Sequence, residues 1–151
     1  MWYRVFCRSA DELPPGDLLA KVREQGIRVE ARFRWDDLGW TAAEFVLGQG
    51  TPIFAERYLT DTDDLRNDLN TWAGYLETLD YSPNHISLME RVIQTKQLIT
   101  IRKPLAHPDE VAVERLGEVL CRTLAAAADG IYQIESNGWY ASTGEVLLKE
   151  Y

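Results

Sequence analysis

Cysteine and histidine are scarce in this chain, which has only two of each among 151 residues. Cys7 and Cys121 fall in a strand-like and a helix-like segment, and neither belongs to a Cys-x-x-Cys pair. Disulfide frameworks and zinc sites usually show closely spaced cysteines, so we expect two buried, reduced thiols. Because reduced thiols are typical of the cytosol, we predict a cytoplasmic location.

Positive charge is also in short supply. Sixteen Lys and Arg residues stand against twenty-four Asp and Glu residues, which gives a net charge of -8. A surface of this sign repels nucleic acids and anionic membranes, so neither is an expected partner. The charge favours a basic partner or none.

Targeting signals and long apolar runs are missing as well. Met1–Arg4 leads directly into a strand-like alternation, without the charged, apolar and cleavage regions of a secretory signal. No apolar run reaches the roughly 18 residues that a membrane span requires. The chain is 46% apolar and has short linkers, which predicts a single globular domain over residues 1–151.

The common catalytic motifs are absent too. The chain contains no Gly-x-Ser-x-Gly elbow, no Gly-rich phosphate loop with Lys and no His-Glu-x-x-His. His85 stands at the start of a predicted helix and His107 in a Pro-flanked loop, and neither belongs to a motif. The sequence therefore favours a protein without enzymatic activity or cofactor, although distant residues can still converge in a fold.

Periodicity indicates an alternation of strands and helices. Period-two patterns predict strands at residues 2–8, 27–34, 41–47, 53–59, 98–103, 131–136, 139–141 and 146–148. Apolar spacings of three and four predict a short helix that Gly26 ends and longer ones over residues 65–79, 83–93 and 109–128. The resulting fold class is α+β, with two β-α-β-β units separated by a helical middle. We expect a mixed or mostly antiparallel sheet with helices on one face, in the style of ferredoxin-like folds.

The segment from Trp35 to Trp40 is the first candidate site. It is predicted as a loop in which two tryptophans flank Asp36 and Asp37. Such a composition is typical of a hot spot for a basic or mixed partner. Alternatively, both rings fold back over the core, and the same two interpretations apply to Trp139 with its neighbour Tyr140.

Arginines on the predicted strands form a second candidate site. Arg28, Arg32 and Arg57 are predicted on a sheet face, where guanidinium forks suit the phosphate or carboxylate of an anionic ligand. Alternatively, these arginines pair across strands with acidic residues, namely Glu30, Glu44 and Glu56. The full set of strand arginines also includes Arg4, Arg8, Arg34 and Arg102.

Asp61, Asp63 and Asp64 form an acidic cluster with two possible roles. Their spacing lacks the central Gly and terminal Glu of a calcium loop, so no metal site is predicted. Instead we expect Asp61 to cap the next helix and the other two to complement its dipole.

The ending of the chain resembles that of small bacterial α+β domains, some of which are immunity proteins against toxins. The likeness rests on the turn residues Asp129–Ile131, Asn137–Tyr140 and Gly144, and no site residue follows from it. Our leading hypothesis is an immunity-like or accessory protein that binds another protein through the Trp35–Trp40 segment. The alternative is a small-molecule binder or cryptic enzyme with a pocket at the arginine-bearing face. A homodimer formed through sheet edges is a third hypothesis.

Overall fold

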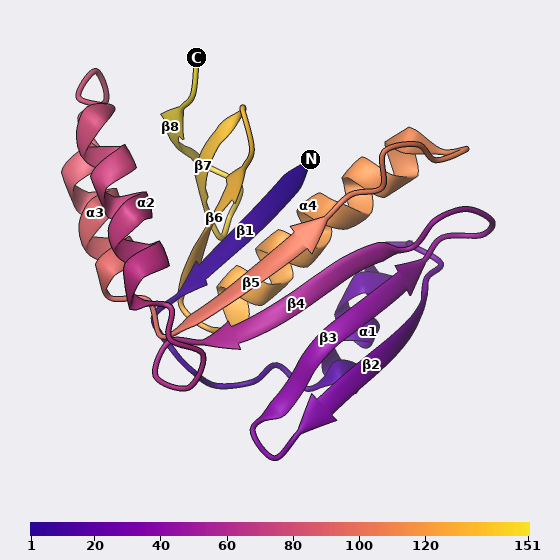
Figure 1. Cartoon of the computed structure of the whole chain (residues 1–151). Coiled ribbons are helices and arrows are strands. Elements are labelled where there is room, and N and C mark those ends of the chain that lie inside the picture. Colours follow the sequence, from indigo (N-terminus) through magenta and orange to yellow (C-terminus); the bar gives the residue numbers. More distant parts are fainter.

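A single eight-stranded antiparallel sheet organises the protein. The computed structural model describes all residues from Met1 to Tyr151 (Figure 1). The strands are β1 (Trp2–Cys7), β2 (Glu30–Asp36), β3 (Gly39–Val46), β4 (Ile53–Leu59), β5 (Gln97–Arg102), β6 (Gly130–Ile134), β7 (Gly138–Ala141) and β8 (Val146–Lys149). Their order is β2-β3-β4-β5-β1-β6-β7-β8, and every neighbouring pair is antiparallel. The predicted α+β class with a mostly antiparallel sheet is therefore confirmed.

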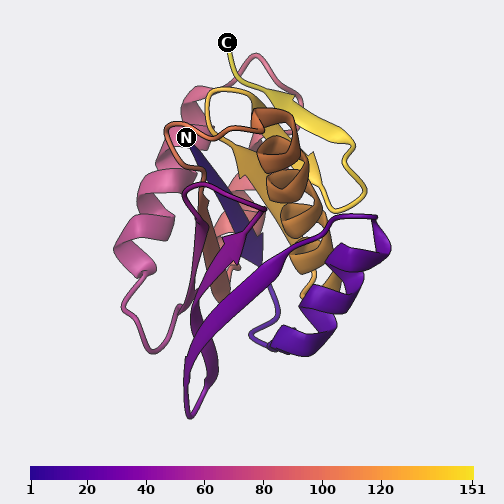
Figure 2. The same cartoon turned by 90° about the vertical axis from the view of Figure 1, so that its right-hand side faces the viewer.

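Helices cover both faces of this sheet, so the expectation of helices on one face is wrong. The helices are α1 (Pro15–Glu24), α2 (Arg66–Thr78), α3 (His85–Ile93) and α4 (Glu110–Ala127). Helices α1 and α4 lie on one side and α2 and α3 on the other, with the sheet between them (Figure 2). The physical reason is visible in β1, where Val5 packs into one core and Phe6 into the other. A strand that is apolar on both faces requires cover on both.

The strands of the two β-α-β-β units interleave within the sheet. β5 begins the second β-α-β-β unit, yet it lies between β4 and β1 of the first unit. β6 of the second unit in turn pairs with β1 of the first, so β1 lies between two strands of the second unit. This order does not confirm the ferredoxin-like arrangement that the sequence led us to expect.

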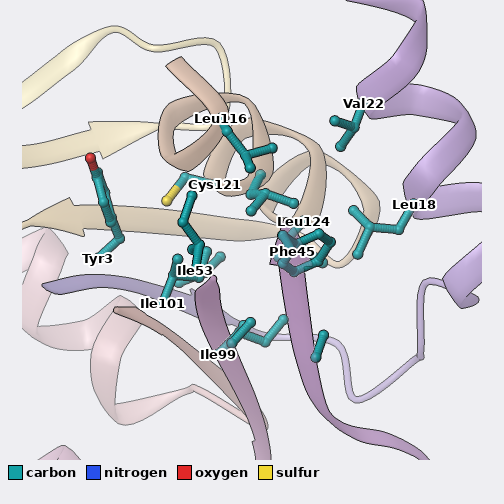
Figure 3. Close-up of a cluster of buried hydrophobic side chains, with 14 of the residues drawn as sticks. Tyr3, Leu18, Val22, Phe45, Ile53, Ile99, Ile101, Leu116, Cys121 and Leu124 are labelled. Atoms are coloured by element: carbon teal, nitrogen blue, oxygen red, sulfur yellow. The ribbon is translucent and has the colours of Figure 1, made fainter. Parts of the chain in front are cut away.

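The larger core lies between the sheet and the helices α1 and α4. Figure 3 shows helix side chains directed at apolar residues of the strands, among them Leu18, Val22, Leu116, Leu124, Phe45, Ile99 and Ile101. Tyr3 packs directly on the backbone of Gly117, where an added Cβ atom would come within 2.7 Å of the ring carbon Cζ. Cys7 and Cys121 are buried here as free thiols, as predicted, and burial raises the pKa of Cys7 to about 12.

The second core lies between the sheet and the helices α2 and α3, and it extends over only part of that face of the sheet. The ring of Phe6 stacks on Trp139 with centroids 5.3 Å apart, and Trp72 of α2 meets both rings edge-on. The buried residues of this core come from the helices and from β1, β5, β6, β7 and β8, and none from β2 or β3. The outer strands are therefore uncovered by helices on this face.

Candidate functional site

The segment predicted as a loop is a tight hairpin. β2 continues through Trp35 and Asp36, and β3 begins at Gly39, so only Asp37 and Leu38 form the turn. The carboxylate of Asp36 accepts a hydrogen bond from the backbone N–H of Leu38 at 2.8 Å, which closes the turn. Gly39 has φ of +110°, a conformation that suits glycine. The tip of this hairpin projects from one end of the molecule (Figure 1).

The two tryptophans of the hairpin have opposite environments, although they are cross-strand neighbours. Trp40 is 1% exposed, and its indole Nε1 donates a hydrogen bond to the carbonyl of Leu13 at 3.1 Å. Its backbone N–H donates to the carboxylate of Glu12. Trp35 is 72% exposed. The predicted site is thus divided, because Trp40 folds back onto the core and only Trp35 is exposed to solvent.

The exposed tip carries the remaining residues of the predicted site. Asp36 and Asp37 are exposed beside Trp35, and Leu38 adds an exposed apolar side chain. Leu38 was not among the residues predicted for this site. Its position between Asp37 and Gly39 in a two-residue turn was the available signal, because turn side chains point to solvent. The tip therefore combines an indole and a leucine with two carboxylates.

Arg57 lies inside the protein and not on an open face, in contrast to the sequence-based expectation. It follows Ile53 and Ala55 on the side of the sheet that packs against α1 and α4, and it is 6% exposed. Burial lowers the pKa of its guanidinium, while the nearby carboxylates of Glu12 and Asp36 act in the opposite direction. Arg57 is thus separated from Arg28 and Arg32, with which it was grouped.

The guanidinium of Arg57 joins three segments of the chain. Its Nη1 donates to the carbonyls of Leu38 and Trp40, both at 3.1 Å. Its Nη2 donates to the carbonyl of Ala10 at 3.2 Å, and its Nε donates to the side chain of Gln97. The amide of Gln97 in turn donates to the carbonyls of Ser9 and Asp11 at 3.0 Å. This buried network fixes the hairpin to the segment that leads into α1.

Arg28 and Arg32 do not form the predicted paired lattice. Arg32 lies opposite Glu44 across β2 and β3, yet the two side chains make no ion pair within 4.0 Å. Arg28 precedes β2 and is exposed. The ion pairs of the structure lie elsewhere and are Arg4–Glu135, Arg8–Asp129, Arg91–Asp129, Lys103–Glu114 and Arg122–Glu118. The strand arginines near Arg32 therefore keep their charges free.

A hollow of about 510 Å³ lies over the uncovered outer strands. Its charged lining consists of Arg32, Arg34, Arg102, Glu44 and Glu56, and its apolar lining of Phe33, Phe54 and three alanines, Ala42, Ala43 and Ala55. Of the predicted ligand-binding residues, only Arg32 takes part. Phe54 was not anticipated, although its alternation with the core residues Ile53 and Ala55 already placed it on this opposite face.

The two histidines make local contacts to the backbone. His85 Nδ1 lies 3.3 Å from the carbonyl of Leu76, and His107 Nδ1 accepts a hydrogen bond from the N–H of Asp109 at 2.9 Å.

Trp139 is fully buried, and Tyr140 stacks on Tyr132 with ring centroids 5.2 Å apart. These aromatic residues therefore belong to the packing of the fold.

The acidic cluster has a different local role from the one predicted. Helix α2 begins at Arg66 with Leu65 at its N-cap position, and no side chain caps it. Asp61 is therefore not the cap. Asp63 instead accepts a hydrogen bond from the N–H of Leu59 at 2.7 Å, and so it closes the turn that follows β4. No group of three His, Cys, Asp or Glu side chains in the structure is arranged to hold a metal ion.

The chain matches no known family model, no curated protein and no solved structure. None of its helices combines the length and apolar character needed to cross a bilayer. The candidate surfaces therefore rest on their own geometry and chemistry. They are the tip of the β2–β3 hairpin and the hollow over the outer strands.

Proposed function

We propose that this protein is a non-enzymatic protein-interaction module of the bacterial cytoplasm, immunity-like or accessory, that binds a partner protein through the hairpin tip. The tip comprises Trp35, Asp36, Asp37 and Leu38. The observation that carries the proposal is the 72% exposure of the Trp35 side chain. A tryptophan left in water at a hairpin tip gains from contact with a partner, because its large apolar surface is then removed from solvent.

The composition of the tip defines the kind of partner. Tryptophan is enriched among the residues that dominate binding energies, and Leu38 extends the apolar area beside it. Asp36 and Asp37 place two carboxylates at the same tip. An apolar pocket bordered by Lys or Arg side chains would complement this surface in shape and in charge.

The base of the hairpin supports the proposal because it is held rigidly. The Arg57 guanidinium holds the carbonyls of Leu38 and Trp40, and the Trp40 ring is buried. A tip that is fixed before binding loses less conformational entropy on association. Trp35 is thus displayed from an ordered support.

The test requires variants that alter the tip and spare the fold. A Trp35→Ala, Leu38→Ala double variant removes the apolar surface, whereas substitution of Trp40 would also remove core packing. The matched control is Leu105→Ala, Val111→Ala, which deletes two exposed apolar side chains of the segment before and within the start of α4. That segment lies far from the hairpin tip (Figure 1).

A partner captured from bacterial lysate by the wild-type protein would be purified and titrated calorimetrically against each variant. We expect the tip variant to lose at least about 2 kcal/mol of binding free energy, roughly thirtyfold in Kd, and the control to bind normally. Asp36→Asn, Asp37→Asn should weaken binding mainly at low salt, because screening reduces exposed charge effects. Equal affinity of the tip variant and the wild type would refute the assignment of this surface.

A further inference from the structure

The uncovered part of the sheet carries an ordered row of charged and aromatic side chains. In the strand register, Arg32 of β2 lies opposite Glu44 of β3, and Glu44 lies opposite Phe54 of β4. Phe54 in turn lies opposite Arg102 of β5, and Arg102 lies opposite Trp2 of β1. Directly paired residues of neighbouring strands point to the same face. These five side chains therefore cross the sheet in one line, on the side that carries the hollow.

Arg102 is held in this row by two aromatic rings. Its guanidinium carbon lies 5.2 Å from the ring centroid of Phe54 and 5.7 Å from that of Trp2. Both distances fall within the range of cation–π attraction. Stacking of this kind positions a guanidinium without using its N–H donors.

The lining of the hollow has three arginines and two glutamates, and none of the three guanidinium groups is in an ion pair. The arginines are Arg32, Arg34 and Arg102, and all three are exposed. Glu56, in contrast, already accepts a hydrogen bond from the hydroxyl of Tyr58 at 2.6 Å. The hollow therefore offers guanidinium donors that have no carboxylate partner of their own.

We propose that this hollow is a binding site for a small organic anion that has a flat ring and carboxylate or phosphate groups. Its volume of about 510 Å³ suits a ligand of this size, and Phe54 and Ala42 provide apolar contact for a ring. Arg102 and Arg34 supply forked donors for the anionic groups. The site is distinct from the hairpin tip and does not depend on the function proposed for it.

The overall charge of the protein selects a small anion over a nucleic acid. The net charge is -8, and Glu44 and Glu56 lie within the hollow. A long polyanion would meet this acidic surface along its length, and its affinity depends on many phosphate contacts. A small anion experiences mainly the nearest charges, because screening at physiological salt limits electrostatic reach to about 8 Å.

The experiment is an NMR titration of the whole protein that follows backbone amides of β2–β5 and the arginine Nε–H signals. Terephthalate and phenyl phosphate are the probes, with benzyl alcohol as the uncharged ring. We expect saturable shifts at Arg32, Arg34 and Arg102 with millimolar or tighter Kd for at least one anion, and none for benzyl alcohol. The tighter of the two anions identifies carboxylate or phosphate as the preferred group.

Two variants and one matched control test the residues. Arg102→Gln should weaken binding by about tenfold, because it removes a charge-assisted contact of the kind worth 1.4 kcal/mol or more. Phe54→Leu should weaken it less. Arg28→Gln removes an exposed arginine that does not line the hollow, and it should leave Kd unchanged.

Three results would overturn the proposal. The first is an absence of saturable shifts at millimolar concentrations of both anions. The second is an equal loss of affinity in Arg28→Gln and Arg102→Gln, which would indicate unspecific attraction. The third is tighter binding of a single-stranded oligothymidylate than of either anion, which would make the row of aromatic and arginine side chains a nucleic-acid surface.

Discussion

The guanidinium of Arg57 donates a hydrogen bond to the backbone carbonyl of Trp40 at a distance of 3.1 Å, although seventeen positions separate the two residues. The same nitrogen also donates to the carbonyl of Leu38 in the hairpin turn. A single buried cation thus satisfies two acceptors of the hairpin that carries Trp35. Stability of the fold and presentation of the tip depend on the same side chain.

The first prediction concerns this network. Arg57→Ala leaves the carbonyl of Trp40 without the donor of a buried hydrogen bond, and it removes the part-buried bonds to the carbonyls of Leu38 and Ala10. A buried acceptor that loses its donor is costly. We expect the free energy of unfolding to fall by about 3 kcal/mol, measured by urea denaturation. The control is Arg32→Ala at an exposed position, which should change stability by less than about 0.5 kcal/mol. Similar losses in both variants would contradict the role of the network.

The second prediction separates the two tryptophans of the hairpin. Trp40→Ala removes a fully buried ring that packs against Phe33 with centroids 5.8 Å apart, so it should cost about 3–5 kcal/mol of stability. Trp35→Ala removes an exposed ring and should cost less than about 0.5 kcal/mol. Urea denaturation of both variants measures the difference. A large loss in Trp35→Ala would show that its indole supports the fold, and would weaken its assignment as a binding residue.

The different environments of Trp35 and Trp40 show what the sequence could not provide. Alternation and turn residues located both strands of the hairpin. The burial of Trp40, however, depends on Glu12 and Leu13, which reach its backbone and indole from the segment before α1. Contacts between segments so far apart in the chain leave no periodic signal. The presence of the hairpin was therefore predictable, whereas the accessibility of each ring was not.

The predictions of an exposed Arg57 and of helices on one face only were wrong, although the sequence contained the signals that contradict them. Strict alternation with Ile53 and Ala55 already placed Arg57 on a core-facing side, but arginine is rarely buried and was assigned to solvent. Likewise, the run Val5–Cys7 in β1 is continuously apolar, a pattern typical of strands covered on both faces. Both signals were present at the level of single residues.

The third prediction tests the contact between Tyr3 and α4. An alanine at position 117 would place its Cβ atom 2.7 Å from the Tyr3 ring carbon Cζ, closer than real contacts allow. Both residues are buried, so we expect Gly117→Ala to destabilise the protein by about 1–3 kcal/mol.

Gly74 in α2 provides the matched control, because a Cβ atom there would meet no atom within 4 Å. Gly74→Ala should raise stability by about 0.5–1 kcal/mol through the better helix propensity of alanine. Thermal denaturation of both variants gives the comparison. A gain in stability in both variants would mean that helix propensity, and not the contact with Tyr3, dominates at position 117.

The fourth prediction is a pH dependence that arises at Asp129. Its carboxylate accepts hydrogen bonds from Arg8 Nε at 2.9 Å and from Arg8 Nη2 at 3.1 Å, and these bonds lower the pKa of Asp129 below its usual 3.8. A lowered folded-state pKa means that the ionised carboxylate stabilises the fold above the unfolded-state pKa. That stabilisation is lost as the pH falls through the folded-state value. Because Asp129 is more than half exposed, the contribution should stay below about 1 kcal/mol.

Asp129→Asn tests this dependence without disturbing the backbone, because asparagine also tolerates the positive φ of 54° at this position. We expect the variant to be less stable than the wild type at neutral pH, and the two to converge at an acidic pH below the folded-state pKa of Asp129, where the wild-type carboxylate is protonated. Urea denaturation at both pH values measures this convergence. Asp37→Asn, at an exposed carboxylate outside the ion pairs, should change stability at neutral pH by less than about 0.5 kcal/mol. An equal deficit of Asp129→Asn at both pH values would mean that Asp129 acts through turn geometry and not through its charge.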